Sequence, residues 1–178
     1  MFVILLFTTT GKDFKTSSII HVPYQYLSAS EKKQVDCLTE NIFYEAAYEP
    51  EEGRIAVGLV TLNRVKSKVF PETVCEVVHQ KTTFYNKVIC QFTWLCEGKN
   101  TITEKQQTLY EEARKIALYV YFNHAVIDDV TDGAIYYHAD YVSPGWKKLQ
   151  KTKQIGRHIF YIDPKVNTDY GRKTQYKS

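Results

Sequence analysis

The sequence lacks the short motifs that mark several large enzyme classes. It contains no Gly-x-Ser-x-Gly, no phosphate-binding loop and no His-Glu-x-x-His pair, which argues against serine hydrolysis, nucleotide chemistry and a metalloprotease-type zinc helix. The cysteines at positions 90 and 96 do not have common zinc spacing. A zinc site built from His138, His158 and an acid is the one metal alternative left open, and otherwise we expect no metal and no cofactor.

Long apolar runs and a strong charge of either sign are also missing. Residues 1–7 are too few to span a bilayer and have no basic region, so they make an unconvincing signal peptide. The formal net charge of +3 is too small to favour nucleic acid, although it is compatible with an anionic polymer such as the bacterial cell wall. We therefore predict no nucleic-acid partner and no stable membrane insertion.

What the sequence does contain is a globular composition with many aromatic residues. Its 178 residues suit one domain, which we expect to be monomeric. It has 14 Tyr, 9 Phe and 2 Trp, and tyrosine-rich surfaces suit sugars, bases or partner proteins because the ring stacks while the hydroxyl bonds. Its cysteines allow three pairings; two disulfides would fit an exported enzyme and four thiols a cytosolic one. They are Cys37, Cys75, Cys90 and Cys96.

The first two-thirds of the chain predict helices. Ser28 and Glu31 form a capping-box pattern that opens a helix over about 29–48. Pro50 suits the first position of a second helix, whose body is apolar almost all round and therefore buried. A short third helix follows over about 72–79 and a fourth over about 104–124, whereas residues 80–103 have an irregular pattern.

The last third predicts strands instead. Residues 134–139 and 158–162 are rich in β-branched and aromatic side chains, and a turn with glycine precedes each. Together they predict a small antiparallel hairpin or sheet packed on the helices, and hence an α+β fold. We divide the chain into an N-terminal extension of uncertain structure (1–27), a catalytic domain (28–163) and a polar C-terminal tail (164–178).

Two glutamates near the end of the first helix occupy an unusual place. Val35, Leu38 and Ile42 define the apolar face of this helix, and Glu45 and Glu49 fall at its edge. A carboxylate that faces the core must be paired, or its pKa must rise so that it stays protonated. The protonated state is the one that general acid catalysis requires. The plainer alternative is a glutamate that pairs with an arginine or caps a nearby backbone.

Carboxylate chemistry is therefore the chemistry that the sequence favours. Glycoside hydrolases usually use two acids, and Glu49 is the second acid with support from the pattern. In a one-acid route, a sugar hydroxyl closes on the anomeric carbon and Glu45, by then ionised, accepts its proton. Polar groups and aromatic walls must then hold the sugar, although each aromatic ring has core packing as its alternative role. Residues of suitable type are Thr93, Trp94, Tyr137, His138 and Trp146.

Four blocks of sequence resemble the SleB-type cell-wall hydrolase family, which includes spore cortex-lytic enzymes and phage wall hydrolases. They appear in the family's order over about residues 37–162, which makes the combined match specific. The blocks are Asn-Ile-Phe-Tyr-Glu-Ala-Ala-Tyr-Glu-Pro (41–50); Ile-Ala-Val-Gly-Leu-Val-Thr-Leu-Asn-Arg-Val (55–65); Phe-Pro-Glu-Thr-Val-Cys (70–75) with Cys-Gln-Phe-Thr-Trp (90–94); and Gly-Ala-Ile-Tyr-Tyr-His-Ala (133–139) with Pro-Gly-Trp (144–146) and Ile-Gly-Arg-His-Ile-Phe-Tyr (155–161).

This resemblance implies a peptidoglycan-cleaving enzyme with a lysozyme-like α+β fold and an active site similar to that of lytic transglycosylases. It implies that Glu45 is the catalytic acid. The family often reads Glu-Ala-Arg-Gly-Glu-Pro at this helix end, whereas this chain has Glu45-Ala-Ala-Tyr-Glu49-Pro, so Glu49 lacks a possible arginine partner. The residues expected to bind the saccharide are Glu49, Thr93, Trp94, Tyr137, His138 and Trp146.

The expected activity is cleavage between MurNAc and GlcNAc in bacterial peptidoglycan, as a lytic transglycosylase or muramidase. We expect the protein to be exported or released to the cell wall or periplasm. Two rivals stay open on sequence grounds. One is a peptidoglycan amidase, which would normally need zinc. The other is a non-catalytic wall-binding or virion protein, in which Glu45 would be paired and sealed from any groove.

Overall fold

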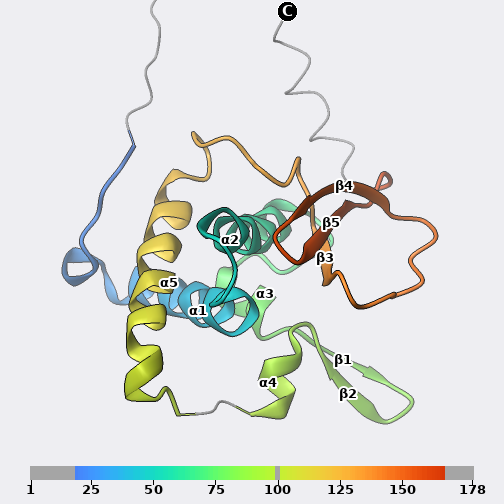
Figure 1. Ribbon diagram of the computed structural model, residues 1–178, viewed down its shortest axis with the longest axis horizontal. Helices are drawn as coiled ribbons and strands as arrows, with labels where there is room; N and C mark the ends of the chain where they lie inside the picture. The colour runs from blue at the N-terminus through green and yellow to red at the C-terminus, as the bar shows by residue number, and fades with distance from the viewer. Residues whose placement is uncertain (1–18, 99–100, 167–178) are drawn as a thin grey trace, which may run out of the picture.

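The computed structural model describes residues 19–98 and 101–166. In this part of the chain, five α-helices form one body and a three-stranded antiparallel sheet packs beside it (Figure 1). The predicted α+β class is confirmed. The helical elements are η1 (Tyr24–Tyr26), α1 (Ala29–Ala46), α2 (Glu51–Lys66), α3 (Val74–Val78), α4 (Thr93–Glu97) and α5 (Glu104–Asn123). The strands are β1 (Lys81–Phe84), β2 (Lys87–Cys90), β3 (Tyr136–Ala139), β4 (Gln150–Ile155) and β5 (His158–Ile162).

Helix α1 begins as its sequence predicts. Ser28 Oγ accepts a hydrogen bond from the backbone N–H of Glu31, and Glu31 Oε2 accepts one from the backbone N–H of Ser28, so the capping box is confirmed. Leu38 and Ile42 are fully buried, which confirms the predicted apolar face. The helix ends at Ala46 rather than at residue 48, because the chain must leave helical geometry before Pro50.

Helix α2 is the central element, and it packs against α1, α5 and β4. A glycine allows the close approach to α1, since a Cβ at Gly58 would lie 3.2 Å from Ile42 Cδ1. Pro50 has an extended ψ of 157° and caps the helix, so the prediction that it fills the first helical position is wrong by one residue. The all-round apolar body is buried, as expected.

Two clusters of buried side chains meet at α2. The larger cluster joins α1, α2, α3 and α5. The smaller one joins Ala56 and Val60 of α2 to Ala134, Ile155 and Phe160. Fully burying such a side chain contributes roughly 1.5–3 kcal/mol, and this second cluster therefore holds the sheet against the helices, next to the end of α1.

The sheet has the strand order β3-β5-β4, with both pairings antiparallel. The predicted small antiparallel sheet is confirmed. Strand β4 is an addition, because Lys151 and Lys153 disguise its pattern; as an edge strand, it exposes most of its side chains. In the β3–β5 register, Tyr137 lies opposite Phe160 and Ala139 lies opposite His158.

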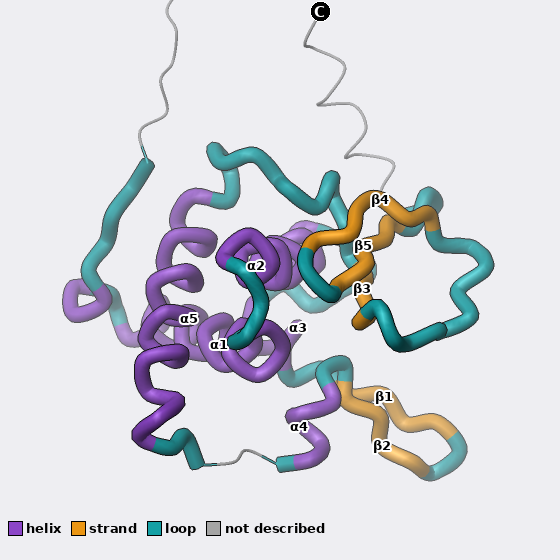
Figure 2. The backbone as a smooth tube through the Cα atoms, in the orientation of Figure 1, coloured by secondary structure: helices purple, strands orange, loops and turns teal. Residues whose placement is uncertain are grey.

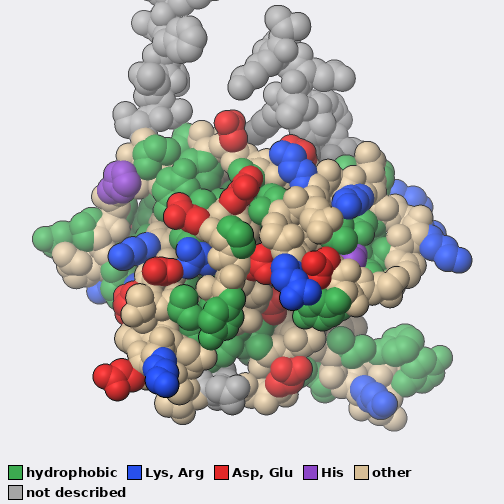
Figure 3. All heavy atoms as spheres, viewed as in Figure 1, with side chains coloured by type: hydrophobic (Ala, Val, Ile, Leu, Met, Phe, Trp, Pro, Cys, Tyr) green, Lys and Arg blue, Asp and Glu red, His purple; other side chains and the backbone are tan. Residues whose placement is uncertain are grey.

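The expectation of irregular structure over residues 80–103 is wrong, because β1, β2 and α4 lie there. The two strands form a hairpin that projects from the body (Figure 2), with Tyr85 and Asn86 at positive φ in the turn. Its strands are exposed up to Cys90, so no burial pattern marks them in the sequence. Hydrophobic side chains gather over this hairpin in Figure 3, where acidic and basic side chains are interspersed on the rest of the face shown.

Two disulfides link elements of the helical body and the hairpin. Cys37–Cys75 joins α1 to α3, and Cys90–Cys96 joins the hairpin to α4, which selects one of the three pairings that the sequence allows.

Near the N-terminus, the backbone N–H of Ile20 donates to Asn123 Oδ1 at 2.7 Å, so residues before 28 also pack on the domain. The expectations for a leader over 1–7 and for most of the tail over 164–178 lie outside the described residues.

Candidate active site

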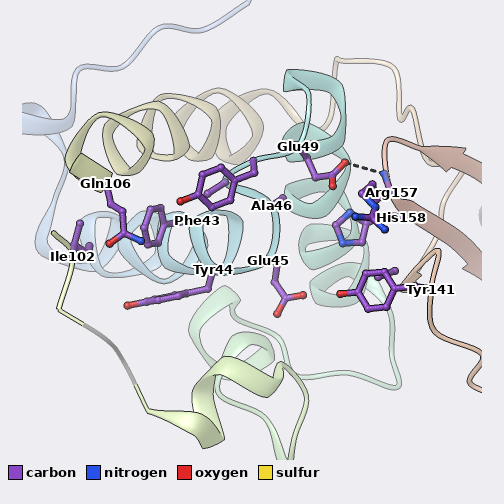
Figure 4. Close-up of a pocket in the computed structure, with 13 residues that line it drawn as sticks. Phe43, Tyr44, Glu45, Ala46, Glu49, Ile102, Gln106, Tyr141, Arg157 and His158 are labelled. Carbon is purple, nitrogen blue, oxygen red and sulfur yellow. Dashed lines mark hydrogen bonds between the residues drawn. The ribbon is translucent and has the colours of Figure 1, made fainter. Parts of the chain in front are cut away.

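A cavity of about 420 Å³ opens at the C-terminal end of α1. Its walls come from three directions: the end of α1, the start of α5 and the tips of the β3–β5 sheet (Figure 4). Glu45 projects into this space, between Tyr44 on one side and Tyr141 on the other. The lining residues are Phe43–Glu49, Ile102, Gln106, Ala139, Tyr141, Arg157 and His158.

Glu45 is the acid at this helix end for which the sequence predicts a raised pKa. Burial raises the pKa of its carboxyl above the ordinary value. The hydrogen bond from Tyr137 and the positive charge of Arg64 both act in the opposite direction, but burial is the larger effect. The residue also lines an open cavity, so it is not sealed, and it forms no ion pair with another described residue. A carboxylic acid in this setting is suited to donate a proton to a bound molecule.

Tyr137 reaches Glu45 from the sheet. Its hydroxyl donates to Glu45 Oε2 at 3.0 Å, which fixes the position of the carboxyl group. Burial and the neighbouring carboxylate raise the pKa of Tyr137 well above its ordinary value, so the hydroxyl stays protonated and remains a donor. Its ring packs against His158 and Phe160, and the second hydrophobic cluster thereby orients it.

Arg64 is a buried cation behind the site. Its Nε donates to the carbonyl of Ile135 at 2.8 Å, and its guanidinium lies over the rings of Phe70, Phe92 and Tyr136. Arg64 therefore bonds a backbone carbonyl just before β3. Its charge still influences Glu45 through space.

Glu49 lies one turn beyond Glu45 but has a different environment. Its Oε2 accepts a hydrogen bond from the backbone N–H of Arg157 at 2.9 Å (Figure 4). Gly156 permits this contact, because its φ is +54° and a Cβ there would collide with the same carboxylate oxygen. The Glu49 carboxylate therefore holds the β4–β5 turn against the end of α1. The arginine that the family often has between the two glutamates is not present in this sequence.

The remaining predicted saccharide ligands are divided between different places. His138 lies on the opposite side of β3 from Tyr137; its Nε2 is 2.9 Å from the Tyr161 hydroxyl, and its ring meets Trp146. Trp146 is 38% exposed. Thr93 is exposed at the start of α4. The structure thus brings Tyr137 to Glu45 and leaves the other three outside the cavity lining.

Trp94 is the predicted wall residue whose position differs most from expectation. It is only 6% exposed, its Nε1 donates to Asn41 Oδ1 at 3.3 Å, and its ring stacks on Tyr44 at 4.7 Å. The core role is the one the structure shows, and Tyr44 is the ring that lines the cavity in its place. The zinc alternative also fails geometrically, because His138 and His158 face opposite sides of the sheet.

Most of the cavity lining was missed by sequence reasoning, including the side chains of Tyr44, Tyr141, Arg157 and His158 that surround Glu45 and Glu49. Strand alternation could have revealed one of them, since a strand that directs Phe160 into the core must direct His158 the same way. Tyr141 and Arg157 lie in turns whose positions depend on the three-stranded pairing. Among the described residues, no group of three or more His, Cys, Asp or Glu side chains is arranged to hold a metal ion.

Fold and site together define an α+β domain built around a half-buried glutamic acid in an open cavity. The model of the Cell Wall Hydrolase family matches residues 48–161, which is more than half of the chain, and the chain belongs to this family. The match begins three residues after Glu45, so the role of Glu45 depends on the geometry described above and on the resemblance of the helix end.

Individual relatives agree with this assignment. A spore cortex-lytic enzyme of Oceanobacillus iheyensis is 28% identical over 158 residues, which cover 85% of this chain and 48% of the relative. A spore cortex-lytic enzyme of Halalkalibacterium halodurans is 30% identical over 133 residues, which cover 71% of this chain and 34% of the relative. The chain therefore spans half or less of the length of these curated relatives.

Two solved structures share the fold. The catalytic domain of the germination-specific lytic transglycosylase SleB from Bacillus anthracis superimposes with a TM-score of 0.56 at 28% identity, covering 79% of this chain and all of that domain. The catalytic domain of the Bacillus cereus SleB protein gives a TM-score of 0.51 at 30% identity. The match covers 73% of this chain and 91% of that domain. The lysozyme-like α+β fold expected from the sequence is confirmed.

No helix in the described ranges has the length and hydropathy to cross a bilayer.

Proposed function

We propose that this chain cleaves the glycan strands of bacterial peptidoglycan between MurNAc and GlcNAc, with Glu45 as the single catalytic carboxyl group. The observation that carries this proposal is the Glu45 carboxyl, which is held by Tyr137, has a pKa raised by burial and faces a cavity wide enough for a sugar. Membership of the cell-wall hydrolase family and the likeness to two SleB catalytic domains support the substrate class.

The proposed reaction uses Glu45 twice. Protonated Glu45 first gives its proton to the glycosidic oxygen, and the bond from this oxygen to the anomeric carbon breaks. Glu45, now a carboxylate, then accepts the proton of the sugar's C6 hydroxyl as that oxygen bonds to the anomeric carbon, which leaves a 1,6-anhydro end. The Tyr137 hydroxyl stabilises the ionised form between the two steps. If water takes the place of the C6 hydroxyl, the product is a reducing end.

The sugar would lie between aromatic walls. Tyr44 and Tyr141 flank Glu45 in the cavity (Figure 4), and tyrosine rings suit this task because they stack on sugar faces and bond through their hydroxyls. Thr93, His138 and Trp146 stay predictions as contacts with more distant sugars, and Glu49 stays one as a supporting residue. Two disulfides are typical of proteins that act outside the cytosol, and we propose that this protein acts at the cell wall or periplasm as a monomer.

Mass spectrometry of digested peptidoglycan tests the proposal. We expect muropeptides that are lighter than hydrolysed products by one water and that resist borohydride reduction. Reducible muramic ends would retain glycan cleavage but replace transglycosylation with hydrolysis. Freed stem peptides with intact glycan strands would contradict the proposal and favour an amidase, and no digestion at all would favour a non-catalytic wall-binding protein.

The substitution Glu45→Gln tests the acid itself, and we expect a loss of activity of about 10²–10⁴-fold because general acid catalysis contributes that much. Stability gives a second readout. Because burial raises the folded-state pKa of Glu45, ionisation destabilises the fold as pH rises above the ordinary glutamate pKa, and the neutral Gln avoids this cost. Glu45→Gln should therefore raise Tm at neutral pH more than at acid pH. Lysis at a near wild-type rate would refute the assignment of the acid.

A further inference from the structure

His158 is a buried histidine in the wall of the Glu45 cavity. It is the first residue of β5 and is only 7% exposed, yet it lines the cavity. Its strand places it opposite Ala139, and its ring meets the edge of Tyr137 with a centroid separation of 5.1 Å. Figure 4 shows the imidazole between Glu49 and Tyr141, on the sheet side of the space above Glu45.

The imidazole of His158 makes no hydrogen bond in the described part of the chain. Its Nδ1 is shielded from solvent, which leaves Nε2 as the ring nitrogen that a molecule in the cavity can reach. Two polar side chains near the ring are hydrogen-bonded to other groups: the Tyr137 hydroxyl donates to Glu45, and Glu49 Oε2 accepts from Arg157 N–H. A buried polar atom left unpaired costs about 1–3 kcal/mol, and such atoms are uncommon in folded proteins.

The charge of His158 is set by opposing neighbours. Burial lowers its pKa below the ordinary value, and His138 acts in the same direction. The carboxylates of Glu49 and Asp140 raise it, but burial is the largest effect. A neutral imidazole has one donor and one acceptor nitrogen. A sugar hydroxyl is likewise both a donor and an acceptor, so it matches this ring better than a charged ligand would.

We infer that His158 is a saccharide-binding residue, whose accessible imidazole nitrogen, Nε2, bonds a hydroxyl group of the sugar that Glu45 protonates. This inference rests on the proposed function, because it names a further contact within the same site. The ring and the Glu45 carboxyl line the same cavity, so the two groups could both contact one bound sugar. Such two-point contact restricts the sugar's rotation over the acid, which favours reaction by orientation.

A purely structural role for His158 predicts a different response to substitution. Its ring contacts Tyr137 and Phe160, so it could serve as an aromatic packing residue. His158→Phe keeps the ring and these contacts but removes both nitrogens. His158→Gln removes the ring but restores a donor and an acceptor. His79→Phe is the matched control, because His79 is exposed at the end of α3 and lies outside the cavity.

Binding of a soluble peptidoglycan tetrasaccharide to the Glu45→Gln protein, measured by calorimetry, separates these roles without any need for cleavage. We expect His158→Phe in this background to weaken binding about five- to tenfold, which is the loss expected for one hydrogen bond. His158→Gln should recover part of it, and His79→Phe should bind like the parent. Equal binding by the His158→Phe and parent proteins would overturn the inference.

Nitrogen NMR of the His158 ring gives a readout that does not depend on the folding of any His158 variant. Adding the tetrasaccharide to the Glu45→Gln protein should move the imidazole nitrogen signals of His158, and unchanged signals at saturation would overturn the inference. The proposed function fails separately, if wild-type protein leaves glycan strands uncut. In that case saccharide binding through His158 would still be visible in the Glu45→Gln protein.

Discussion

The two faces of the β3–β5 sheet contain similar aromatic and histidine side chains but have different surroundings. The inner face, toward the helices, carries Tyr137, His158 and Phe160. The outer face carries His138 and Tyr161, whose rings stack at 5.3 Å with the His138 Nε2 bonded to the Tyr161 hydroxyl. On the inner face burial shifts the pKa values of Tyr137 and His158, and the Tyr137 hydroxyl donates to Glu45.

The outer face shows what the same residue types do nearer to solvent. His138 has both ring nitrogens within hydrogen-bond distance of protein oxygens, at 2.8 and 2.9 Å. Trp146 lies against this cluster and is 38% exposed. Proximity in sequence is a poor guide to the site here, because Tyr137 and His138 are neighbours in the chain but lie on opposite faces of the sheet.

The largest expected contrast concerns stability. Phe160 is fully buried in the cluster that joins the sheet to α2, and Phe160→Ala should cost about 3–5 kcal/mol of the free energy of unfolding. Tyr161→Ala, one residue away on the outer face, should cost only about 1 kcal/mol. Urea unfolding followed by circular dichroism measures both. Equal costs would mean that the two faces do not differ in packing as described.

The second contrast between the two faces concerns the activity and the pKa of Glu45. Tyr137→Phe removes the hydroxyl that donates to Glu45, and a hydrogen bond to a charged group is worth about 1.5–3 kcal/mol, so we expect a roughly ten- to hundredfold loss of kcat/KM. The bond lowers the pKa of Glu45. Its removal should therefore raise that pKa and move the alkaline limb of the pH–activity profile to higher pH.

Tyr136→Phe is the control for this experiment, because Tyr136 precedes Tyr137 and points to the other side of the strand, toward Phe70 and Trp146. It should leave the position of the alkaline limb unchanged. A limb that moves to lower pH in Tyr137→Phe, or that moves equally in both variants, would show that Tyr137 does not stabilise the ionised form of Glu45.

Much of the fold and the central acid could be predicted because they follow from local patterns. The capping box at Ser28 fixes where α1 begins, and three- and four-residue spacing identifies its buried face. The same spacing placed Glu45 and Glu49 at the edge of that face. It could not separate them, since their difference arises from Tyr137 and Arg157, which approach from residues far along the chain.

The parts that could not be predicted depend on contacts distant in sequence or on exposed strands. The β1–β2 hairpin is exposed up to Cys90, and β4 is an edge strand rich in lysine, so neither has the alternation of a half-buried strand. Whether Trp94 lines the cavity or the core depends on Tyr44, which covers one face of the indole. Spacing along the sequence contains no information about that choice.

The smallest expected effect belongs to the outer face. Trp146 is exposed enough to meet a sugar beyond the cavity, but it does not line the space around Glu45. A stacking contact of this kind is worth about 0.5–1.5 kcal/mol, so Trp146→Ala should raise KM for long glycan strands about two- to tenfold and leave kcat unchanged. Kinetics on glycan strands of graded length measure this, and short fragments should show no difference. A fall in kcat as large as that of Tyr137→Phe would mean that the outer face borders the reacting sugar, and that both faces of the sheet belong to one site.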